Sequence, residues 1–272
     1  MIPLVPAKAG TQRFGQRTGC PLSRARTALA VISLYVMSST TTHAANRLPG
    51  DLVYLRDIDS SIRQDMRYAG SDNFTGHTLS GYDAPECLLR RAVALALMRV
   101  QQDLAEHNLS LKVYDCYRPA RAVRAMARWA RNPKALPDTS RFYPELDKSK
   151  LFALGYIASR SAHSRGVAID LTIVRRGAPP RPAFDPRAGY GSCVDAPTAR
   201  APDDSLDMGT GFDCFDIRSW TRNTDIASAQ QANRRLLLDA MTKHGFANYK
   251  REWWHFSYRT GGGAYDVPIR PR

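Results

Sequence analysis

Residues 166–174 form an apolar run that contains one carboxylate, Asp170. The flanking Ile169, Leu171 and Ile173 predict a buried strand, because a short apolar run of this length is typical of a strand inside a core. An unpaired carboxylate is costly to bury, so the fold must bring a metal ion or a cation to Asp170. The chain must therefore fold so that other segments supply this partner to the strand.

Two of the six histidines are candidates for that distant partner. His163 lies in a Ser/Gly-rich turn seven residues before Asp170, a spacing that lets the turn and the strand converge on one ion. His255 ends the segment Glu252-Trp-Trp-His255. A catalytic zinc ion keeps three protein ligands and an open fourth position, so the two imidazoles and Asp170 are predicted ligands. Glu252 is then available as a base.

The spacing of Glu252 and His255 raises a structural question. Trp-rich, β-prone surroundings favour a strand, on which residues three apart point to opposite faces unless the backbone is irregular. We therefore predict a bulge or kink between them. The alternative, that Glu252 and the two tryptophans form a surface patch at a rim, stays open at this stage.

Apolar periodicity predicts a set of helices and strands. The helices are expected over residues 85–107, 120–130 and 227–244, and the strands over residues 109–114, 166–174 and 246–258. The last helix is expected to bury Leu236, Leu237 and Met241. Residues 175–204, crowded with Pro, Gly and Ala, predict an insertion held by Cys193. No repeat or linker divides the chain, so a single α+β domain is expected over residues 45–272.

Four of the five cysteines lie in this expected domain, and an even number fits an oxidising compartment. Four cysteines allow three pairings. We favour Cys87 with Cys116 and Cys193 with Cys214, because each pair flanks one local unit of the chain. A zinc site built from cysteines lacks any C-x-x-C spacing.

The first 44 residues have the anatomy of a secretory signal peptide. Arg24 and Arg26 precede a ten-residue apolar run, and a small-residue segment ending at Ala44 follows. The run is too short to span a bilayer, so we expect cleavage near Ala44 and a periplasmic or secreted protein without a stable membrane anchor.

The charge of the chain is strongly positive, with a formal value of +14. The predicted signal segment holds five basic residues and no acidic one, so its removal lowers this value to +9. A basic protein can bind nucleic acid, but no motif for nucleic-acid binding is present. We expect no nucleic-acid partner, and a cationic surface suits an anionic cell envelope or wall.

Five motifs follow one another along the chain: Asp72-Asn-Phe-Thr-Gly76, Asp115-Cys-Tyr-Arg118-Pro119, Ser161-x-His163-x-x-Gly166-x-Ala168-x-Asp170, Asp207-Met-Gly-Thr-x-Phe-Asp213 and Glu252-Trp-Trp-His255. In sequence and in order they resemble those of the zinc D-alanyl-D-alanine dipeptidases of the vancomycin-resistance type. The resemblance covers residues 52–268. It implies the fold that this family shares with other zinc D,D-peptidases and the hedgehog signalling domain, a small, mainly antiparallel sheet packed by helices.

The resemblance also implies roles for particular residues. It makes His163, Asp170 and His255 the ligands of one zinc ion per chain and Glu252 the catalytic carboxylate. It makes Arg118 the cation that stabilises the developing oxyanion. Further residues fall where the family holds its substrate, Tyr68 and Asp213 at the ammonium group and Ser161 near the carboxylate.

Two features depart from the family pattern: Cys116 replaces a glycine, and the insertion over residues 175–204 is longer than in the short cytoplasmic members. The expected activity is hydrolysis of the D-alanyl-D-alanine dipeptide, in cell-wall metabolism or glycopeptide resistance. A D,D-carboxypeptidase that acts on peptidoglycan stem peptides is the nearest alternative. A zinc-stabilised binding module without turnover is another, although such a module is expected to lose Glu252 or Arg118.

Overall fold

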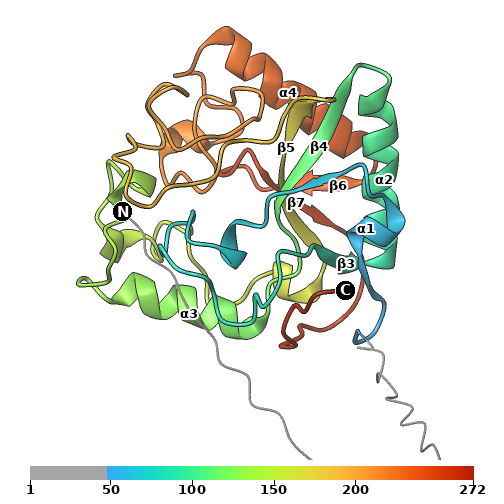
Figure 1. Cartoon of the computed structure of the whole chain (residues 1–272), viewed down its shortest axis with the longest axis horizontal. Helices are drawn as coiled ribbons and strands as arrows, with labels where there is room; N and C mark the ends of the chain where they lie inside the picture. The colour runs from blue at the N-terminus through green and yellow to red at the C-terminus, as the bar shows by residue number, and fades with distance from the viewer. Residues whose placement is uncertain (1–47) are drawn as a thin grey trace, which may run out of the picture. The chain divides into compact units, whose positions relative to one another are not determined.

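A five-stranded sheet runs through the part of the chain that the computed structural model describes, residues 48–272 (Figure 1). Its strands, in spatial order, are β2 (Arg63–Gln64), β4 (Leu109–Asp115), β5 (Ala168–Arg175), β7 (His255–Tyr258) and β6 (Phe246–Asn248). β2 pairs parallel with β4, and the other neighbours are antiparallel. The expected α+β fold with a small, mainly antiparallel sheet is confirmed.

Four α-helices accompany the sheet in the described residues, together with several short 3-10 turns. α2 (Arg91–Ala105) packs against β4 and against α4 (Ser228–Lys243), which also packs against β6. α1 (Leu55–Ile58) is a single turn beside α2, and α3 (Ala120–Arg131) lies apart from the α2–α4 pair, as Figure 1 shows. The 3-10 turns are η1 (Arg67–Ala69), η2 (Ser140–Phe142), η3 (Lys148–Lys150), η4 (His163–Arg165) and η5 (Ile217–Ser219).

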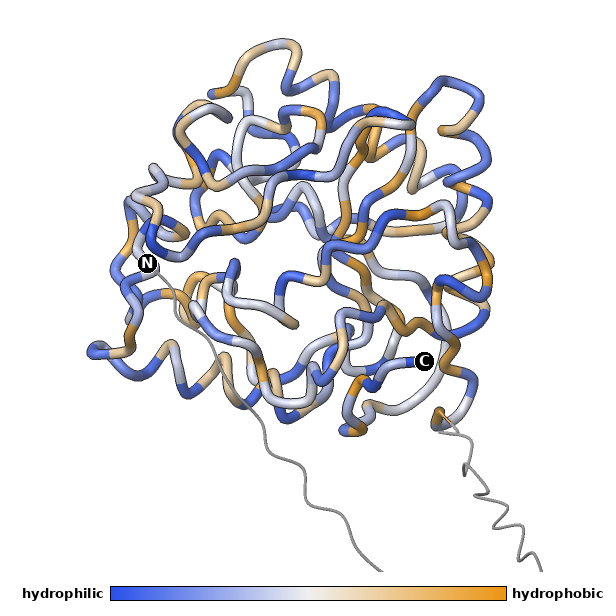
Figure 2. The backbone as a smooth tube through the Cα atoms, in the orientation of Figure 1, coloured by the Kyte–Doolittle hydropathy of each residue, from blue (hydrophilic) through white to orange (hydrophobic). Residues whose placement is uncertain are grey.

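The core lies between the helices and the sheet. α2 buries Val93, Leu97 and Val100 completely, at the spacing that places them on one helical face. β5 is buried over seven of its eight residues, because it is a central strand covered on both sides. In Figure 2 the hydrophobic colour gathers along the central strands, whereas the outer turns are mainly hydrophilic.

The predicted helix over residues 85–107 is wrong at its beginning. Leu88–Arg90 forms the strand β3, which pairs antiparallel with β1 (Leu52–Tyr54) in a separate two-stranded sheet. The apolar residues of this segment fit a helical period, but pairing with β1 holds their backbone extended, and the helix begins only at Arg91. Long-range pairing has therefore overridden the local pattern.

The expected inward positions of α4 need one correction. Leu237 and Met241 are fully buried, whereas Leu236 is 37% exposed. Residues four apart share a helical face, and Leu236 lies about 100° around the helix from Leu237. The other predicted elements are confirmed within one or two residues at most of their ends, and the strand pair over residues 246–258 is the β6–β7 hairpin.

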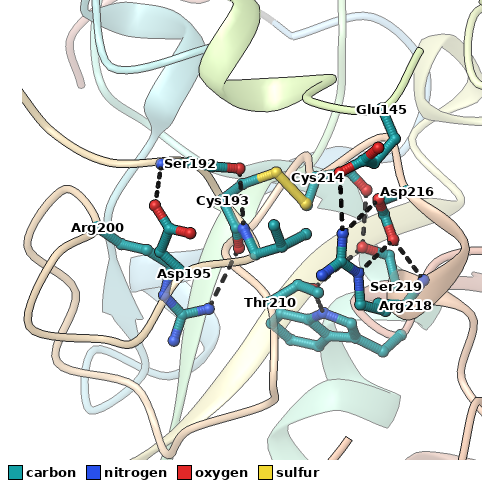
Figure 3. The surroundings of a disulfide bond; sticks show 12 residues. Glu145, Ser192, Cys193, Asp195, Arg200, Thr210, Cys214, Asp216, Arg218 and Ser219 are labelled. Carbon is teal, nitrogen blue, oxygen red and sulfur yellow. Dashed lines mark hydrogen bonds and ion pairs between the residues drawn. A yellow bond between two sulfur atoms is a disulfide. The ribbon is translucent and has the colours of Figure 1, made fainter. Parts of the chain in front are cut away.

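Both favoured disulfides, Cys87–Cys116 and Cys193–Cys214, are confirmed. Figure 3 shows the second of these amid a dense set of hydrogen bonds, in which Ser219 Oγ donates to the carbonyl of Cys214 at 2.7 Å. Gly211 N also donates to the carbonyl of Cys193 at 2.8 Å. This disulfide therefore ties the insertion to the loop over residues 207–219.

The insertion is also held by charge. Within the described chain, residues 176–204 form no helix or strand. Near their end, Asp203 accepts hydrogen bonds at 2.7 Å from Lys112 on β4 and from Arg67 in η1. Lys112 is fully buried, so the charge is compensated inside the structure and not by water.

The predicted signal segment, residues 1–44, lies outside the described residues. Among the residues that are described, none of the helices has the length and apolar character needed to cross a bilayer.

Candidate active site

Strand register brings the three predicted metal ligands together. Asp170 on β5 is directly opposite His255, the first residue of β7. His163 lies in η4, and Gly166, with a φ of 67°, turns the chain from η4 into β5. A left-handed residue between the two elements suits glycine, which has no Cβ to clash. The turn and the strand thus converge as their spacing predicts.

The ligand atoms of these three residues form a compact triangle. His163 Nε2 is 3.2 Å from His255 Nδ1 and 3.3 Å from Asp170 Oδ1, and the remaining side, from His255 Nδ1 to Asp170 Oδ1, is 2.9 Å. Zinc bonds to nitrogen and oxygen of about 2.0–2.1 Å imply tetrahedral edges of roughly 3.3 Å. Two imidazoles and a carboxylate at these separations fit one zinc ion.

A hydrogen bond fixes the orientation of His163. Its Nδ1 donates to the backbone carbonyl of Cys116 at 2.7 Å and lies 3.3 Å from Asp115 Oδ2. Because Nδ1 carries the proton, the lone pair of Nε2 faces His255 and Asp170. This arrangement, a ligand histidine held by a carbonyl and a carboxylate, is the usual support of a metal site.

Arg118 is bound to two carboxylates at the edge of the same cluster. It contacts Asp115 Oδ2 at 2.8 Å and Asp170 Oδ2 at 3.4 Å, and its guanidinium lies 4.9 Å from the ring centre of Tyr68. Burial acts to raise the pKa of Asp170, but the charges and hydrogen bonds of His163 and His255 hold it well below its ordinary value. Asp170 is therefore ionised and able to bind a cation.

Glu252 lies in the turn between β6 and β7 and not on a strand. Glu252 N donates to the carbonyl of Tyr249 and His255 N donates to the carbonyl of Glu252, so the backbone folds back over these residues. The expected irregularity is present, as a turn instead of a bulge. It places Glu252 Oε2 3.8 Å from His255 Nδ1, with the carboxylate facing the cavity and not forming a surface patch.

The environment of Glu252 suits a proton acceptor. Burial raises the pKa of Glu252 to about 7, against the opposing effect of His255. Asp170 adds to the rise, and Arg118 reduces it. A carboxyl group whose pKa lies near neutrality can both take and return a proton.

Tyr68 and Asp213 form a second polar pair in the same cavity. Tyr68 Oη donates to Asp213 Oδ2 at 2.7 Å, and both side chains are buried. Burial raises the pKa of Asp213 well above its ordinary value, and Asp170 adds to this effect. Asp213 has a left-handed φ of 57°, a backbone conformation that is uncommon outside glycine and that Asp adopts more readily than most residues.

Ser161 lies two residues before η4. Its Oγ accepts a hydrogen bond from His163 N at 3.2 Å, and its own hydroxyl proton is then available to a ligand. Every residue named in advance as a ligand, a catalytic group or a substrate contact lines one cavity of about 280 Å³. Its apolar wall includes Val123, Met126 and Ile157.

The other histidines in the described part of the chain lie outside this cavity. His244 contacts Asp103 at 2.7 Å, and His77 contacts the carbonyl of Leu136 at 2.7 Å. His107 does not line the cavity either. His43 lies outside the described residues.

Sequence reasoning missed Asp115. It is fully buried at the end of β4, and it joins Tyr82, Arg118 and His163 through its two oxygens. A register shift in β4 between Val113 and Asp115 turns this carboxylate toward the site. Its position three residues before Arg118 was visible in the sequence, but the bulge that makes it useful was not.

Comparisons with known proteins point to one family over most of the chain. A family model described as D-ala-D-ala dipeptidase matches residues 49–179 and 182–270, and the gap falls in the insertion. A D-alanyl-D-alanine dipeptidase of Streptomyces coelicolor is 34% identical over 212 residues, covering 78% of this chain and 93% of the relative. One from Enterococcus faecalis is 34% identical over 204 residues (75% and 89%), and one from Enterococcus faecium is 32% identical over 220 residues (80% and 97%).

Proposed function

The chain belongs to the D-Ala-D-Ala dipeptidase family, and we propose that it hydrolyses the D-alanyl-D-alanine dipeptide with one zinc ion per chain. The observation that carries the proposal is the meeting of His163, Asp170 and His255 in one cavity with the buried Glu252. No other group of three metal-binding side chains of this kind occurs among the described residues.

Three protein ligands would leave the fourth coordination position of a zinc ion open for water or substrate. A zinc ion held by two imidazoles and one carboxylate would polarise the peptide carbonyl and lower the pKa of a water molecule toward neutrality. The choice of zinc follows from this donor set, since imidazole nitrogen suits zinc whereas magnesium and calcium prefer oxygen.

Glu252 performs the proton transfers in this scheme. It accepts the proton of the attacking water and returns it to the amine that leaves. Both steps are helped because burial holds the pKa of the carboxyl group at about 7. The turn that carries Glu252 places its carboxylate 3.8 Å from His255, next to the residues that would hold the zinc ion.

Arg118 stabilises the charge that develops on the peptide oxygen. A fixed cation aimed at a developing oxyanion inside a buried site lowers the barrier more than it would in water. Asp115 holds Arg118 in place, at 2.8 Å, and so acts as a positioning residue.

A dipeptide substrate presents a free amine that the site must recognise. Asp213 and Tyr68 offer a buried carboxylate and a phenol at one part of the cavity, and an ammonium group bound there would lower the raised pKa of Asp213. Ser161 offers a hydroxyl on the side of η4, where we place the carboxyl end of the substrate. Val123 and Met126 provide apolar contact for the methyl groups.

The proposed location is outside the cytoplasm, periplasmic or secreted. Two disulfides support it, because such bonds persist in oxidising compartments, and so does the predicted signal segment. There the substrate would come from the metabolism of cell-wall peptides, or from a response to glycopeptide antibiotics.

The test is an assay of purified protein whose zinc content has been measured. Wild-type protein is expected to release D-alanine from D-Ala-D-Ala, and to leave L-Ala-L-Ala and a peptidoglycan stem peptide largely intact. Preferred cleavage of the stem peptide would assign the D,D-carboxypeptidase activity instead. Bound zinc without hydrolysis of any D,D-peptide would favour the binding module.

A further inference from the structure

Among the described residues that line the cavity, one permanent cation has no charged partner. Among the described residues that line it, Arg118 and Arg160 carry permanent positive charge. Arg118 is largely buried and is bound to Asp115 and Asp170. Arg160 is exposed, and it forms no hydrogen bond or ion pair with any described residue.

The acidic groups of the cavity do not supply a partner for Arg160. The carboxylates of Asp170, Asp213 and Glu252 also line it, and all three have partners inside the structure. A dipeptide brings one ammonium and one carboxylate into this site. The ammonium has Asp213 as its natural counterion, so the substrate's carboxylate needs a cation that is still available.

The chain path places Arg160 at the right distance. It precedes Ser161, whose hydroxyl can donate, and it lies three residues before His163, so their backbones are at most about 10 Å apart. The terminal carboxylate of a dipeptide is only one residue beyond the bond that is cut. A flexible arginine can therefore reach it from the same loop that supplies the metal ligand.

We propose that Arg160 determines specificity by binding the free C-terminal carboxylate of the substrate, together with the hydroxyl of Ser161. This inference rests on the proposed function and adds a recognition element that neither the motifs nor the metal centre supplied. Arginine binds a carboxylate with two parallel N–H donors, which fixes orientation as well as charge. The site then selects peptides that end one residue after the scissile bond.

The experiment compares two substrates that differ only at this end. Zinc-loaded wild-type, Arg160→Ala and Arg160→Lys proteins are assayed with D-Ala-D-Ala and with its C-terminal carboxamide. For the free acid, Arg160→Ala is expected to raise KM roughly 10-fold to 100-fold, the effect of one charge-assisted contact, while kcat changes little. For the carboxamide, Arg160→Ala is expected to leave KM unchanged, and Arg160→Lys should restore part of the preference for the acid.

The matched control is Arg128→Ala. Arg128 is exposed on α3, its side chain forms no hydrogen bond or ion pair with the rest of the described chain, and it does not line the cavity. This variant removes the same net charge, so a general loss of electrostatic attraction would affect it equally. Its KM and kcat for both substrates are expected to equal those of the wild type.

Binding measurements separate the failure of this inference from failure of the proposed function. Zinc-loaded Glu252→Ala protein is titrated calorimetrically with both ligands, with and without Arg160→Ala. Loss of affinity for the acid alone supports the role of Arg160 even if no variant shows turnover. Equal losses for acid and carboxamide, or no loss for either, would overturn it, whereas absence of hydrolysis by the wild type counts only against the proposed function.

Discussion

The two ends of the cavity are built in different ways. At the metal end, Asp170 and His255 are paired across β5 and β7, and Asp115 ends β4, so three strands of one sheet set the geometry. At the substrate end, Asp213 and Ser161 lie in loops. Strand register leaves little freedom to the ligands, whereas loops can change composition without disturbing the core. We infer that the sheet fixes Asp170, His255 and Asp115, that short turns beside it carry His163 and Glu252, and that loops carry the groups expected to set specificity.

Each end also has its own disulfide. Cys116 of the first bridge supplies the carbonyl that orients His163. Cys214 of the second follows Asp213 directly and ties its loop to the insertion. If the division between the two ends is correct, variants at the metal end should change kcat and zinc affinity, and variants at the substrate end should change KM.

The largest effect is expected from the proton acceptor. Glu252→Ala should keep its zinc and lose about 10²-fold to 10⁴-fold in kcat, because the transfer of protons to and from the reacting groups is removed. The measurement is a steady-state assay on protein whose metal content has been determined. Rates like those of the wild type, in a verified zinc-loaded sample, would end the assignment of Glu252.

A smaller loss is expected from the cation of the metal end. Arg118→Ala should lower kcat by about 10²-fold to 10³-fold, by analogy with the removal of an oxyanion donor. Asp213→Asn is the comparison at the other end, and it should act chiefly on KM for substrates with a free amine. If both variants changed kcat alone, the two ends would not be functionally distinct.

The disulfides give a more moderate and more selective test. The Cys87→Ala, Cys116→Ala double variant is expected to weaken zinc binding about 10-fold to 100-fold, the usual cost of disturbing the groups that support a ligand. Cys193→Ala with Cys214→Ala should leave zinc affinity near that of the wild type and raise KM. Competition with a chelator, well below the unfolding temperature of each variant, measures the first effect. Equal zinc affinities in the two double variants would contradict the comparison.

The smallest effect concerns pH and the charges that hold the insertion. Burial acts to raise the pKa of Asp203, but Lys112 and Arg67 hold it well below its ordinary value. A carboxylate with a lowered pKa stabilises the fold above the ordinary value of about 4, and this contribution is lost as the pH falls toward the folded-state pKa. Asp203→Asn should therefore lower the free energy of unfolding by about 1–3 kcal/mol at pH 7.

The sign of this effect is checked by urea unfolding of both proteins over a pH series. The difference between wild type and Asp203→Asn should shrink as the pH falls below about 4, because the unfolded wild-type chain takes up a proton at this carboxylate there, whereas the folded protein takes it up only at lower pH. Asp185→Asn is the comparison variant with a small expected effect, since Asp185 lies in the same insertion and its side chain bonds, among the described residues, only to the exposed Arg187. A difference that stayed constant with pH would show that Asp203 does not act through its charge.

Several features could be predicted because they depend on neighbouring residues. The periodicity of α3 and the apolar run of β5 gave both elements almost to the residue. The strand β3 could not be predicted in this way, because its extended backbone depends on β1, far away in the sequence. Leu236 shows the same limit on a helix, where adjacent apolar residues fit the pattern equally well but only one faces the core.

In the candidate site, too, some features depend on neighbouring residues and could be predicted, whereas others depend on distant segments and could not. The types of residue in the Ser161 and Glu252 segments were sufficient to name a donor set of two imidazoles and a carboxylate, with a second carboxylate as base. The turn that carries Glu252 was anticipated as an irregularity, because residues three apart on a strand cannot share a face. Asp115 and Arg160 were missed, because the usefulness of each depends on which partners the folded chain leaves to it.

The sequence by itself determined the donor atoms available, the helices and strands that carry them, the disulfide pairing that we favoured, and the family to which they belong. Only the tertiary structure decided that Asp170 and His255 stand opposite each other, that Cys116 orients His163, and that Arg118 is bound while Arg160 is not. The physical reason is that periodicity and turn chemistry act over a few residues. Burial, strand register and charge pairing join segments that lie far apart in the chain.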